Sequence, residues 1–485
     1  MIAPSNCIAG TLAPYTPATG APWDKRRVTH LYRRLGFGAG FAEVNAALAQ
    51  APGALVDTLL NTAAALPTSP EPEWAYWDIS RYANQEMAIE HIFQWRRRWV
   101  LEMLTNGVRE KLALFWHNHF VTRLDSYFCP SWMYQYHKLL QQYALGNFRD
   151  FVYEIGKSPA MLVFLNGVQN TRFNPNENYA RELYELFTLG RDNGYTQQDI
   201  VQTARALTGW NGITQQTLCG EIAFVPAFFD PGQKTIFGRT GNWGYDDVHR
   251  LLFEERGELV AQHICRKLYR AFVSPQVDEA IVAELADIFL THDFELLPVL
   301  RVLFKSEHFF DDVHIGVLVK SPLETMLTLL REGNFQIPWG DTELDGLLYL
   351  SSELGQDLFN PIDVAGWQGD RTWVNSNTLT GRWQALRFIL FTLFQNHPEQ
   401  LRALAADLSN NSNDAEYITE VLVNHFFPNG MQLPEDYDRA TMAFKAEIPN
   451  HYFEDGSWSL AWETAPVQTA LLLDHLVRRP EFQLM

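Results

Sequence analysis

Two carboxylates and an amide share one predicted helical stripe near the middle of the chain. At helical spacing, Asn178, Glu182 and Glu185 fall on the same face, in steps of four and three residues. Burying carboxylates is costly unless a cation or a proton lies opposite them. The stripe therefore predicts either a catalytic or metal site, or an ion-pair network with an arginine. Arg181 and Arg205 are the candidate arginines.

Two histidines at the end of an earlier predicted helix form a second constellation. On a helix, side chains at i and i+2 point about 200° apart, so His117 and His119 share an ion only if the helix ends before them. His119 lies on an aromatic core stripe, where a structural histidine is the more common finding. Histidines and carboxylates are nevertheless the materials of metal sites inside helical bundles. We therefore expect His117, His119, Glu182 and Glu185 as metal ligands.

A third set of polar residues lies in a segment rich in glycine and aromatic residues. Asp230 and Lys234 flank a Pro-Gly turn, which can project both side chains into a cleft as catalytic groups. A turn with solvated charges is the plainer and favoured interpretation. We also expect this segment to cover the mouth of a pocket lined by Trp210, Trp243 and Tyr245, since aromatic side chains in a long loop bury themselves only by packing.

Two later segments are typical of pocket walls. One is the loop 366–371, rich in tryptophan and glycine and followed by Trp373; the other is 320–324, which begins a helix with proline near its first turn. A purely structural role is about as well supported for both. These segments widen the set of candidate elements around a site without assigning a reaction.

The hydrophobic pattern predicts an all-α protein, a large multi-helix domain with one long irregular arm. Residues 1–25 predict an irregular N-terminal arm, and 26–210 a helical core that carries the His and Glu motifs. Periodicity vanishes in 211–247, an aromatic irregular arm in which a small β-hairpin around 222–229 is one reading. Helices return in 248–485, which we expect to continue the fold of 26–210.

Composition limits the partners and the compartment. The 485 residues carry a formal charge of −19, which argues against nucleic acid and anionic membranes as partners. No run reaches the ~18 apolar residues of a membrane helix, so no membrane insertion is expected. The four cysteines form no CxxC pair, and a disulfide stays open. The chain as given predicts a soluble, cytoplasmic protein, with a mature exported form as the alternative.

Motifs in order along nearly the whole chain resemble the bacterial family catalogued as domain of unknown function 1800. They are 34–38 (RLGFG), 115–120 (FWHNHF), 175–182 (PNENYARE), 185–190 (ELFTLG), 194–195 (GY), 199 (D), 204–210 (ARALTGW), 320–322 (KSP) and 480–483 (PEFQ). The resemblance implies frequent export and a sulfatase-like partner protein. Three departures stand out: no visible signal sequence, Phe229-Asp230 in place of His-Asp, and Asn166-Gly167 where an aspartate is common.

Three functions fit these patterns. The favoured one is a metal-dependent enzyme, with an oxidoreductase ahead of zinc-based water activation, using iron, copper, manganese or zinc on a small-molecule or glycan substrate. A metal-free polysaccharide-processing enzyme is the second, with Glu182, Glu185 and a partner such as Asp230 as acid and base and tryptophans stacking on sugars. A non-enzymatic scaffold with a buried ion-pair network is the third.

Overall fold

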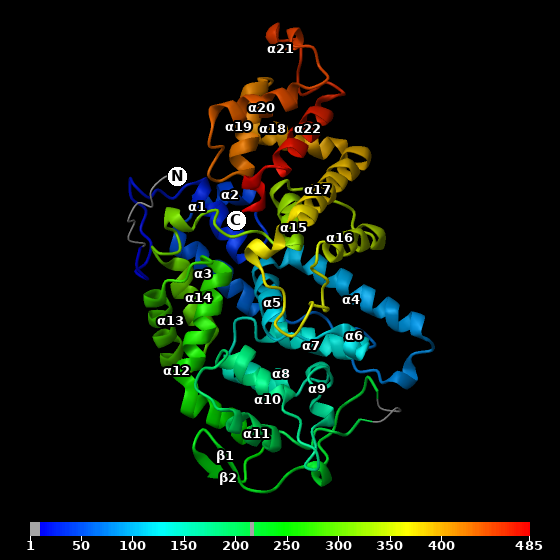
Figure 1. Cartoon of the computed structure of the whole chain (residues 1–485). Coiled ribbons are helices and arrows are strands. Elements are labelled where there is room, and N and C mark those ends of the chain that lie inside the picture. Colours follow the sequence, from blue (N-terminus) through cyan, green and yellow to red (C-terminus); the bar gives the residue numbers. More distant parts are fainter. Residues whose placement is uncertain (1–9, 214–217) are drawn as a thin grey trace.

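The computed structural model describes residues 10–213 and 218–485, and in them the protein is all-α (Figure 1). The N-terminal half contains α1 (Lys25–Leu35), α2 (Phe41–Leu48), α3 (Pro52–Ala65), α4 (Gln85–Thr105), α5 (Gly107–His119), α6 (Leu124–Tyr127), α7 (Pro130–Gln142), α8 (Phe148–Gly156), α9 (Pro159–Phe164), α10 (Asn178–Glu182) and α11 (Gln197–Ala206). The predicted fold class is confirmed.

The C-terminal half is also helical apart from a two-stranded hairpin that precedes it. Its helices are α12 (Tyr245–Phe272), α13 (Glu279–Thr291), α14 (Leu296–Lys305), α15 (Pro322–Glu332), α16 (Asp341–Glu353), α17 (Ser376–Asn396), α18 (Pro398–Ser409), α19 (Ala415–Phe426), α20 (Pro434–Lys445), α21 (His451–Glu454) and α22 (Ala465–Val477). Figure 1 shows α17–α22 gathered at one end of the molecule and α8–α11 at the other, with α5 between them.

Helix α5 is the central element because segments from both halves pack around it. It contacts α3, α4 and α7 of the N-terminal half. The backbone N–H of Phe359, far along the chain, donates to His117 on α5 over 3.0 Å. Trp116 on the same helix is completely buried, and its indole N–H donates to the carbonyl of Ala144 at 3.0 Å. These contacts fix α5 as one wall of the site described below.

Local capping explains where individual helices begin. A capping box begins α11: the hydroxyl of Thr196 accepts from the N–H of Asp199 at 3.1 Å, and the carboxylate of Asp199 accepts from the N–H of Thr196 at 2.8 Å. The second Asp199 oxygen accepts from the N–H of Phe237 at 2.7 Å, which holds the arm against α11. Ser321 and Glu324 form the same motif at the start of α15.

The hairpin of the aromatic arm lies later than expected. The reading that placed it around 222–229 is wrong: β1 (Lys234–Ile236) pairs with the antiparallel β2 (Arg239–Gly241). The two-residue turn between the strands consists of Phe237 and Gly238, both with positive φ, as two-residue hairpin turns of this kind require. The turn sequence is Phe-Gly, and phenylalanine rarely adopts positive φ. The usual Asn-Gly or Asp-Gly signal of such a turn is therefore missing from the sequence, and the hairpin could not be located from it.

A disulfide ties the arm to the helical core. Cys129, at the start of α7, is bonded to Cys219 in the arm, 90 residues later. Beside it, the Ser131 hydroxyl is 2.8 Å from the Cys219 carbonyl, and the indole N–H of Trp132 donates to the carbonyl of Gly220 at 2.7 Å. The N–H of Ile79 also donates to the carbonyl of Leu218 at 2.6 Å, so a covalent bond and three hydrogen bonds hold the arm here. Residues 214–217 of the arm lie outside the described residues.

Candidate ligand-binding site

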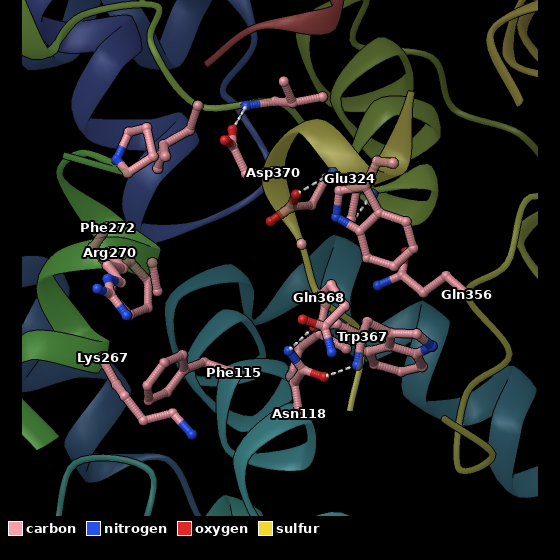
Figure 2. A pocket seen from close by; sticks show the side chains of 18 of the residues that line it. Phe115, Asn118, Lys267, Arg270, Phe272, Glu324, Gln356, Trp367, Gln368 and Asp370 are labelled. Carbon is pink, nitrogen blue, oxygen red and sulfur yellow. Dashed lines mark hydrogen bonds between the residues drawn. The ribbon is translucent and has the colours of Figure 1, made fainter. Parts of the chain in front are cut away.

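A cavity of about 530 Å³ opens beside α5, on the side facing α12, α15 and the segment 365–373 (Figure 2). This volume is within the range of small-molecule sites. Segments remote in sequence contribute aromatic, amide and charged side chains to the wall. Its polar and aromatic residues include Lys111, Phe115, Asn118, His119, Lys267, Arg270, Ser321, Glu324, Gln356, Trp367, Gln368, Asp370 and Trp373. The site therefore forms only in the folded chain.

The last turns of α12 form a cationic wall. Lys267 and Arg270 are three residues apart and so share one helical face, which Figure 2 places opposite the segment of Trp367 and Gln368. Neither side chain forms an ion pair or a hydrogen bond with another described residue. Burial, and after it the charge of Arg270, lower the pKa of Lys267 to about 8. Positive charge near a helix C-terminus is favourable, which offsets part of this cost.

The inner end of the cavity is positively charged as well. Lys111 donates to a carboxylate oxygen of Glu324, and burial lowers the pKa of Lys111 in spite of that partner. Among the described residues of this region, five buried cations stand against two buried carboxylates: Arg33, Arg34, Lys111, Lys320 and Arg382 against Glu324 and Glu332. Half-buried Asp370 is the next nearest acid. Of these seven residues, Lys111 and Glu324 line the cavity, so the surplus of buried positive charge lies behind its Lys111 end, in a protein whose net charge is −19.

Two of the surplus cations have their donors only partly satisfied. Arg34 is completely buried, and its Nε and Nη1 have no hydrogen-bond partner among the described residues. Burial lowers its pKa to about 9, opposed mainly by the charge of Glu324. Arg382 is also buried and donates to the Lys320 carbonyl at 2.7 Å, with its Nε unpartnered. Uncompensated buried cations are costly, so an anion in this region would be stabilised.

The opposite wall is the predicted tryptophan and glycine loop, and its role as a pocket wall is confirmed. The N–H of Trp367 donates to the side-chain oxygen of Asn118 at 2.6 Å, while the amide of Asn118 donates to the Trp367 carbonyl at 3.0 Å. Gly366 has φ +79°, and a Cβ there would stand 2.3 Å from the Asn118 side-chain oxygen. Glycine is therefore required for this approach, which places Trp367 and Trp373 on the cavity.

The predicted histidine ligands point in different directions. His117 is buried, with Nδ1 2.9 Å from the Tyr136 hydroxyl and Nε2 accepting from the N–H of Phe359 at 3.0 Å. Both ring nitrogens are thus occupied, and burial lowers its pKa to about 3. His119 lines the cavity and donates from Nε2 to the carbonyl of Phe187 at 3.0 Å. Burial lowers the pKa of His119 well below its ordinary value, with the charge of Lys267 next in importance.

The helix with the carboxylate motif is not a continuous α-helix. Helix α10 ends at Glu182, within the stripe predicted from helical spacing, and a π-helix, η3 (Leu183–Thr188), follows. The wider turn lets the N–H of Leu189 donate to the carbonyl of Tyr184 at 2.9 Å, five residues back. The π-helix packs against the end of α5, where His119 forms a hydrogen bond with the carbonyl of Phe187.

The acidic side chains of the motif have separate partners. Glu185 lies 3.3 Å from Arg181 and 3.5 Å from Arg191, so one arm of the expected ion-pair network is present. Glu182 forms no ion pair within the described chain, and burial followed by the charge of Glu185 raises its pKa. The backbone N–H of Asn178 donates to the side-chain oxygen of Asn176 at 2.9 Å. These residues are absent from the cavity wall.

In the arm, the side chains of Asp230 and Lys234 form hydrogen bonds within their own turn. The carboxylate of Asp230 accepts from Arg205 at 2.7 Å and from the N–H of Gly232 at 2.8 Å. Burial opposes the negative charge, but these hydrogen bonds outweigh it and lower the pKa of Asp230. The Lys234 ammonium is buried and donates to the backbone carbonyls of Asp230 and Gly232, at 2.5 and 2.9 Å. Trp210 packs against Phe224 and Tyr245; a pocket mouth there stays a prediction.

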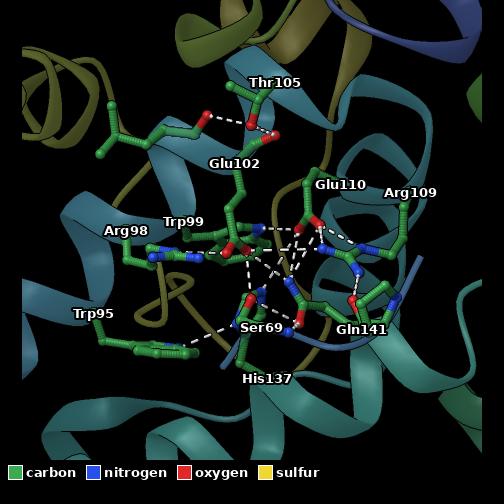
Figure 3. A network of polar contacts seen from close by, with 12 residues as sticks. Ser69, Trp95, Arg98, Trp99, Glu102, Thr105, Arg109, Glu110, His137 and Gln141 are labelled. Atoms are coloured by element: carbon green, nitrogen blue, oxygen red, sulfur yellow. Dashed lines mark hydrogen bonds and ion pairs between the residues drawn. The ribbon is translucent and has the colours of Figure 1, made fainter. Parts of the chain in front are cut away.

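A second buried polar cluster differs from the cavity because its groups satisfy one another (Figure 3). Glu102 and Glu110 both accept from the amide of Gln141, at 2.9 Å and at 3.1 and 3.2 Å. Arg109 forms an ion pair with Glu110 at 2.6 Å, and the backbone N–H of Ser69 donates to Gln141 at 2.9 Å. Burial raises the pKa of Glu110. We interpret this cluster as a structural clamp on the loop that contains Ser69.

No group of three or more histidine, cysteine, aspartate or glutamate side chains able to hold a metal is found in residues 10–213 and 218–485. His117, His119, Glu182 and Glu185 do not make up such a group in this conformation, so a metal ion at these residues stays a prediction. The same residues include no helix long and apolar enough to cross a membrane.

The cations of α12 were missed in the sequence analysis. His263, Lys267 and Arg270 recur at steps of four and three residues, so they lie on one face of a helix that carries further charged residues on its other faces. His263 packs on Gly190, where a Cβ would stand 2.9 Å from its Nδ1. The stripe was detectable from spacing; the absence of acidic partners was not.

Comparison with known proteins places the chain in a family. A model of the family described as "Protein of unknown function (DUF1800)" matches residues 30–484. Searches of curated proteins and of solved structures find no match. Because the family model covers nearly the whole chain, the protein is a member of the DUF1800 family.

Proposed function

We propose that this protein binds an anionic, hydroxylated small molecule of the sugar-acid class in the cavity between α5, α12 and the segment 365–373. The observation that carries the proposal is the pair Lys267 and Arg270, two cations on the cavity wall without an acidic partner in the described chain. Lys267 is partly exposed and Arg270 is exposed, so a ligand can reach both, and a carboxylate or sulfate between them would form charge-assisted hydrogen bonds with both side chains. The buried cation surplus behind Lys111 favours the same sign of ligand.

The remaining wall supports a ligand with hydroxyl groups and a ring. Trp367 and Trp373 offer apolar faces of the kind that stack on sugar rings, and Gln356 and Gln368 offer amides that donate and accept hydrogen bonds. Asp370 adds an acceptor for hydroxyl groups. This combination extends the expectation of a glycan or small-molecule substrate to a charged sugar, and it needs no metal ion for binding.

Paired ligands that differ in charge test the proposal. Calorimetric titration with glucuronate and with glucose should give binding of the acid and at least tenfold weaker binding of the neutral sugar, since hydrogen bonds to charged groups contribute about 1.5–3 kcal/mol. Arg270→Met should weaken glucuronate binding about tenfold or more. Arg250→Met, at an exposed arginine near the start of α12 that is absent from the cavity wall, is the control. Equal binding of both sugars would contradict the proposal.

The disulfide bears on where this activity takes place. Disulfides persist mainly in oxidising compartments, so the Cys129–Cys219 bond supports an exported protein over a cytoplasmic one. Fractionation of cells that produce the native full-length protein, with alkylation of free thiols before lysis, tests this. Recovery in the cytoplasm with both cysteines alkylated would contradict it.

A further inference from the structure

The two lysines of the cavity are in opposite situations. Lys111 is held by Glu324 and by the backbone carbonyl of Arg33, 3.3 Å from its Nζ. Its ammonium is therefore committed to structural contacts. Lys267 lies on the same cavity with no such partner in the described chain. The Lys111 ammonium therefore has a structural role, whereas the Lys267 amine is available to a ligand.

The surroundings of Lys267 favour a neutral amine. Phe115 and Phe272 are apolar neighbours on the cavity wall, and Arg270 contributes a second positive charge one turn away on the helix (Figure 2). The charge of Lys267 also acts on His119 and His263. The remaining charged groups on the cavity wall are Lys111, Glu324 and Asp370. A lysine that is desolvated beside another cation loses its proton readily and becomes a nucleophile. Its pKa of about 8 agrees with this geometry.

We propose that Lys267 forms a reversible imine with an aldehyde or ketone carbon of the anionic ligand, while Arg270 holds the carboxylate of that ligand. This inference rests on the anion site proposed above and narrows its ligand to oxo acids, including sugar acids in their open-chain form. Side chains three residues apart on a helix have Cβ atoms about 5–6 Å apart. This spacing suits a ligand whose carbonyl carbon lies next to, or close to, its carboxylate.

The step balances without an oxidant or a reductant. Lys267 first releases one proton to solvent, and the lone pair of Nζ then attacks the carbonyl carbon, forming a C–N bond as the C=O π electrons move to oxygen. The oxygen takes up protons and leaves as water, and the nitrogen loses its remaining two protons as the C=N bond forms. The products are the imine and one water molecule. Hydrolysis reverses the step and returns the free amine.

Reductive trapping on the full-length protein tests the imine. The protein is incubated near neutral pH with glyoxylate, an aldehyde with a carboxylate, and with cyanoborohydride, which reduces imines to stable amines. Peptide mass spectrometry over time then gives the modification rate of each lysine. We expect Lys267 to react at least about tenfold faster than Lys445, a surface lysine 3.7 Å from Glu416, and Lys111 to stay unmodified.

Comparison with glycolaldehyde, an uncharged aldehyde of similar size, separates imine formation at Lys267 from anion binding at Arg270. Arg270→Met removes a charge that lowers the pKa of Lys267, so labelling by both aldehydes should slow somewhat. Labelling by glyoxylate should slow about tenfold more than labelling by glycolaldehyde, because only glyoxylate also loses the partner of its carboxylate. Equal labelling of Lys267 and Lys445 by glyoxylate would overturn the imine, and if glucuronate still binds, the anion site stands without it. Fast labelling of Lys267 by both aldehydes, insensitive to Arg270→Met, would keep the nucleophile and overturn the anion site.

Discussion

Removing the Lys267 charge should make the free protein more stable. The pKa of this lysine falls from 10.5 to about 8, chiefly because burial penalises the charged form. At about 1.36 kcal/mol per pKa unit, the fall corresponds to about 3 kcal/mol of destabilisation at neutral pH. Lys267→Met keeps an unbranched apolar stem and removes the charge. We therefore expect an increase of about 2–4 kcal/mol in the free energy of unfolding, together with loss of anion binding.

The stability advantage of Lys267→Met over the wild type should decrease as pH rises. Below pH 8 the lysine is protonated in both the folded and the unfolded chain, so the full destabilisation is present. Between about pH 8 and 10.5 the folded protein has lost the proton and the unfolded chain still binds it, so the wild type gains stability as pH rises. The advantage of the variant should therefore shrink to under about 1 kcal/mol at pH 10.

Urea unfolding followed by circular dichroism at pH 7 and pH 10 measures the difference. Lys445→Met, at the partly exposed ion pair with Glu416, serves as the control and should change stability by less than about 1 kcal/mol at either pH. A variant at Lys267 that is less stable than the wild type at pH 7, or whose advantage is the same at both pH values, would refute the electrostatic description of this wall.

Three further outcomes follow from the structure. His117→Ala should lower the free energy of unfolding by about 2–4 kcal/mol in urea titrations, because it leaves the buried N–H of Phe359 without an acceptor, and should leave glucuronate binding unchanged. Replacing Cys129 and Cys219 by serine should cost about 4–5 kcal/mol, the entropy of a closed loop of this length, and equal stability with and without reductant would contradict the bond. Glu182→Gln should melt at or above the wild-type temperature at pH 7: its pKa is raised in the folded state, so its charge destabilises the fold above that pKa and the difference disappears as pH falls. Elemental analysis of the same pair tests the metal prediction, since equal metal content would count against Glu182 as a ligand.

Features encoded locally were accessible from the sequence. The capping box of Thr196 and Asp199 needs only four residues, and it marks the start of α11 correctly. The helix containing His117 and His119 was recognised from its apolar stripe, and the tryptophan loop around Trp367 from its composition. In each case the signal lies within one or two turns of chain, where spacing alone determines which side chains are neighbours.

Features that depend on tertiary contacts were not accessible in the same way. Helical spacing placed Glu182 and Glu185 on one stripe, but the π-helix widens the turn between them, and the carbonyl of Phe187 binds His119 instead. The candidate site itself depends on what is absent around Lys267, and the lack of a partner is a property of the whole fold. The spacing of Lys267 and Arg270 on α12 is visible in the sequence. Whether acidic side chains from other segments form ion pairs with them is not.

The most direct test of the central claim is anomalous diffraction from crystals of the full-length protein soaked in selenate. Selenate is a divalent oxyanion, and its selenium atom can be located without reference to the protein structure. We expect a peak in the cavity, with oxygens about 2.7–3.0 Å from Lys267 Nζ and the guanidinium of Arg270, and its loss in Arg270→Met. A cavity without selenate, in crystals where selenate occupies surface arginines, would contradict an anion site between α5 and α12.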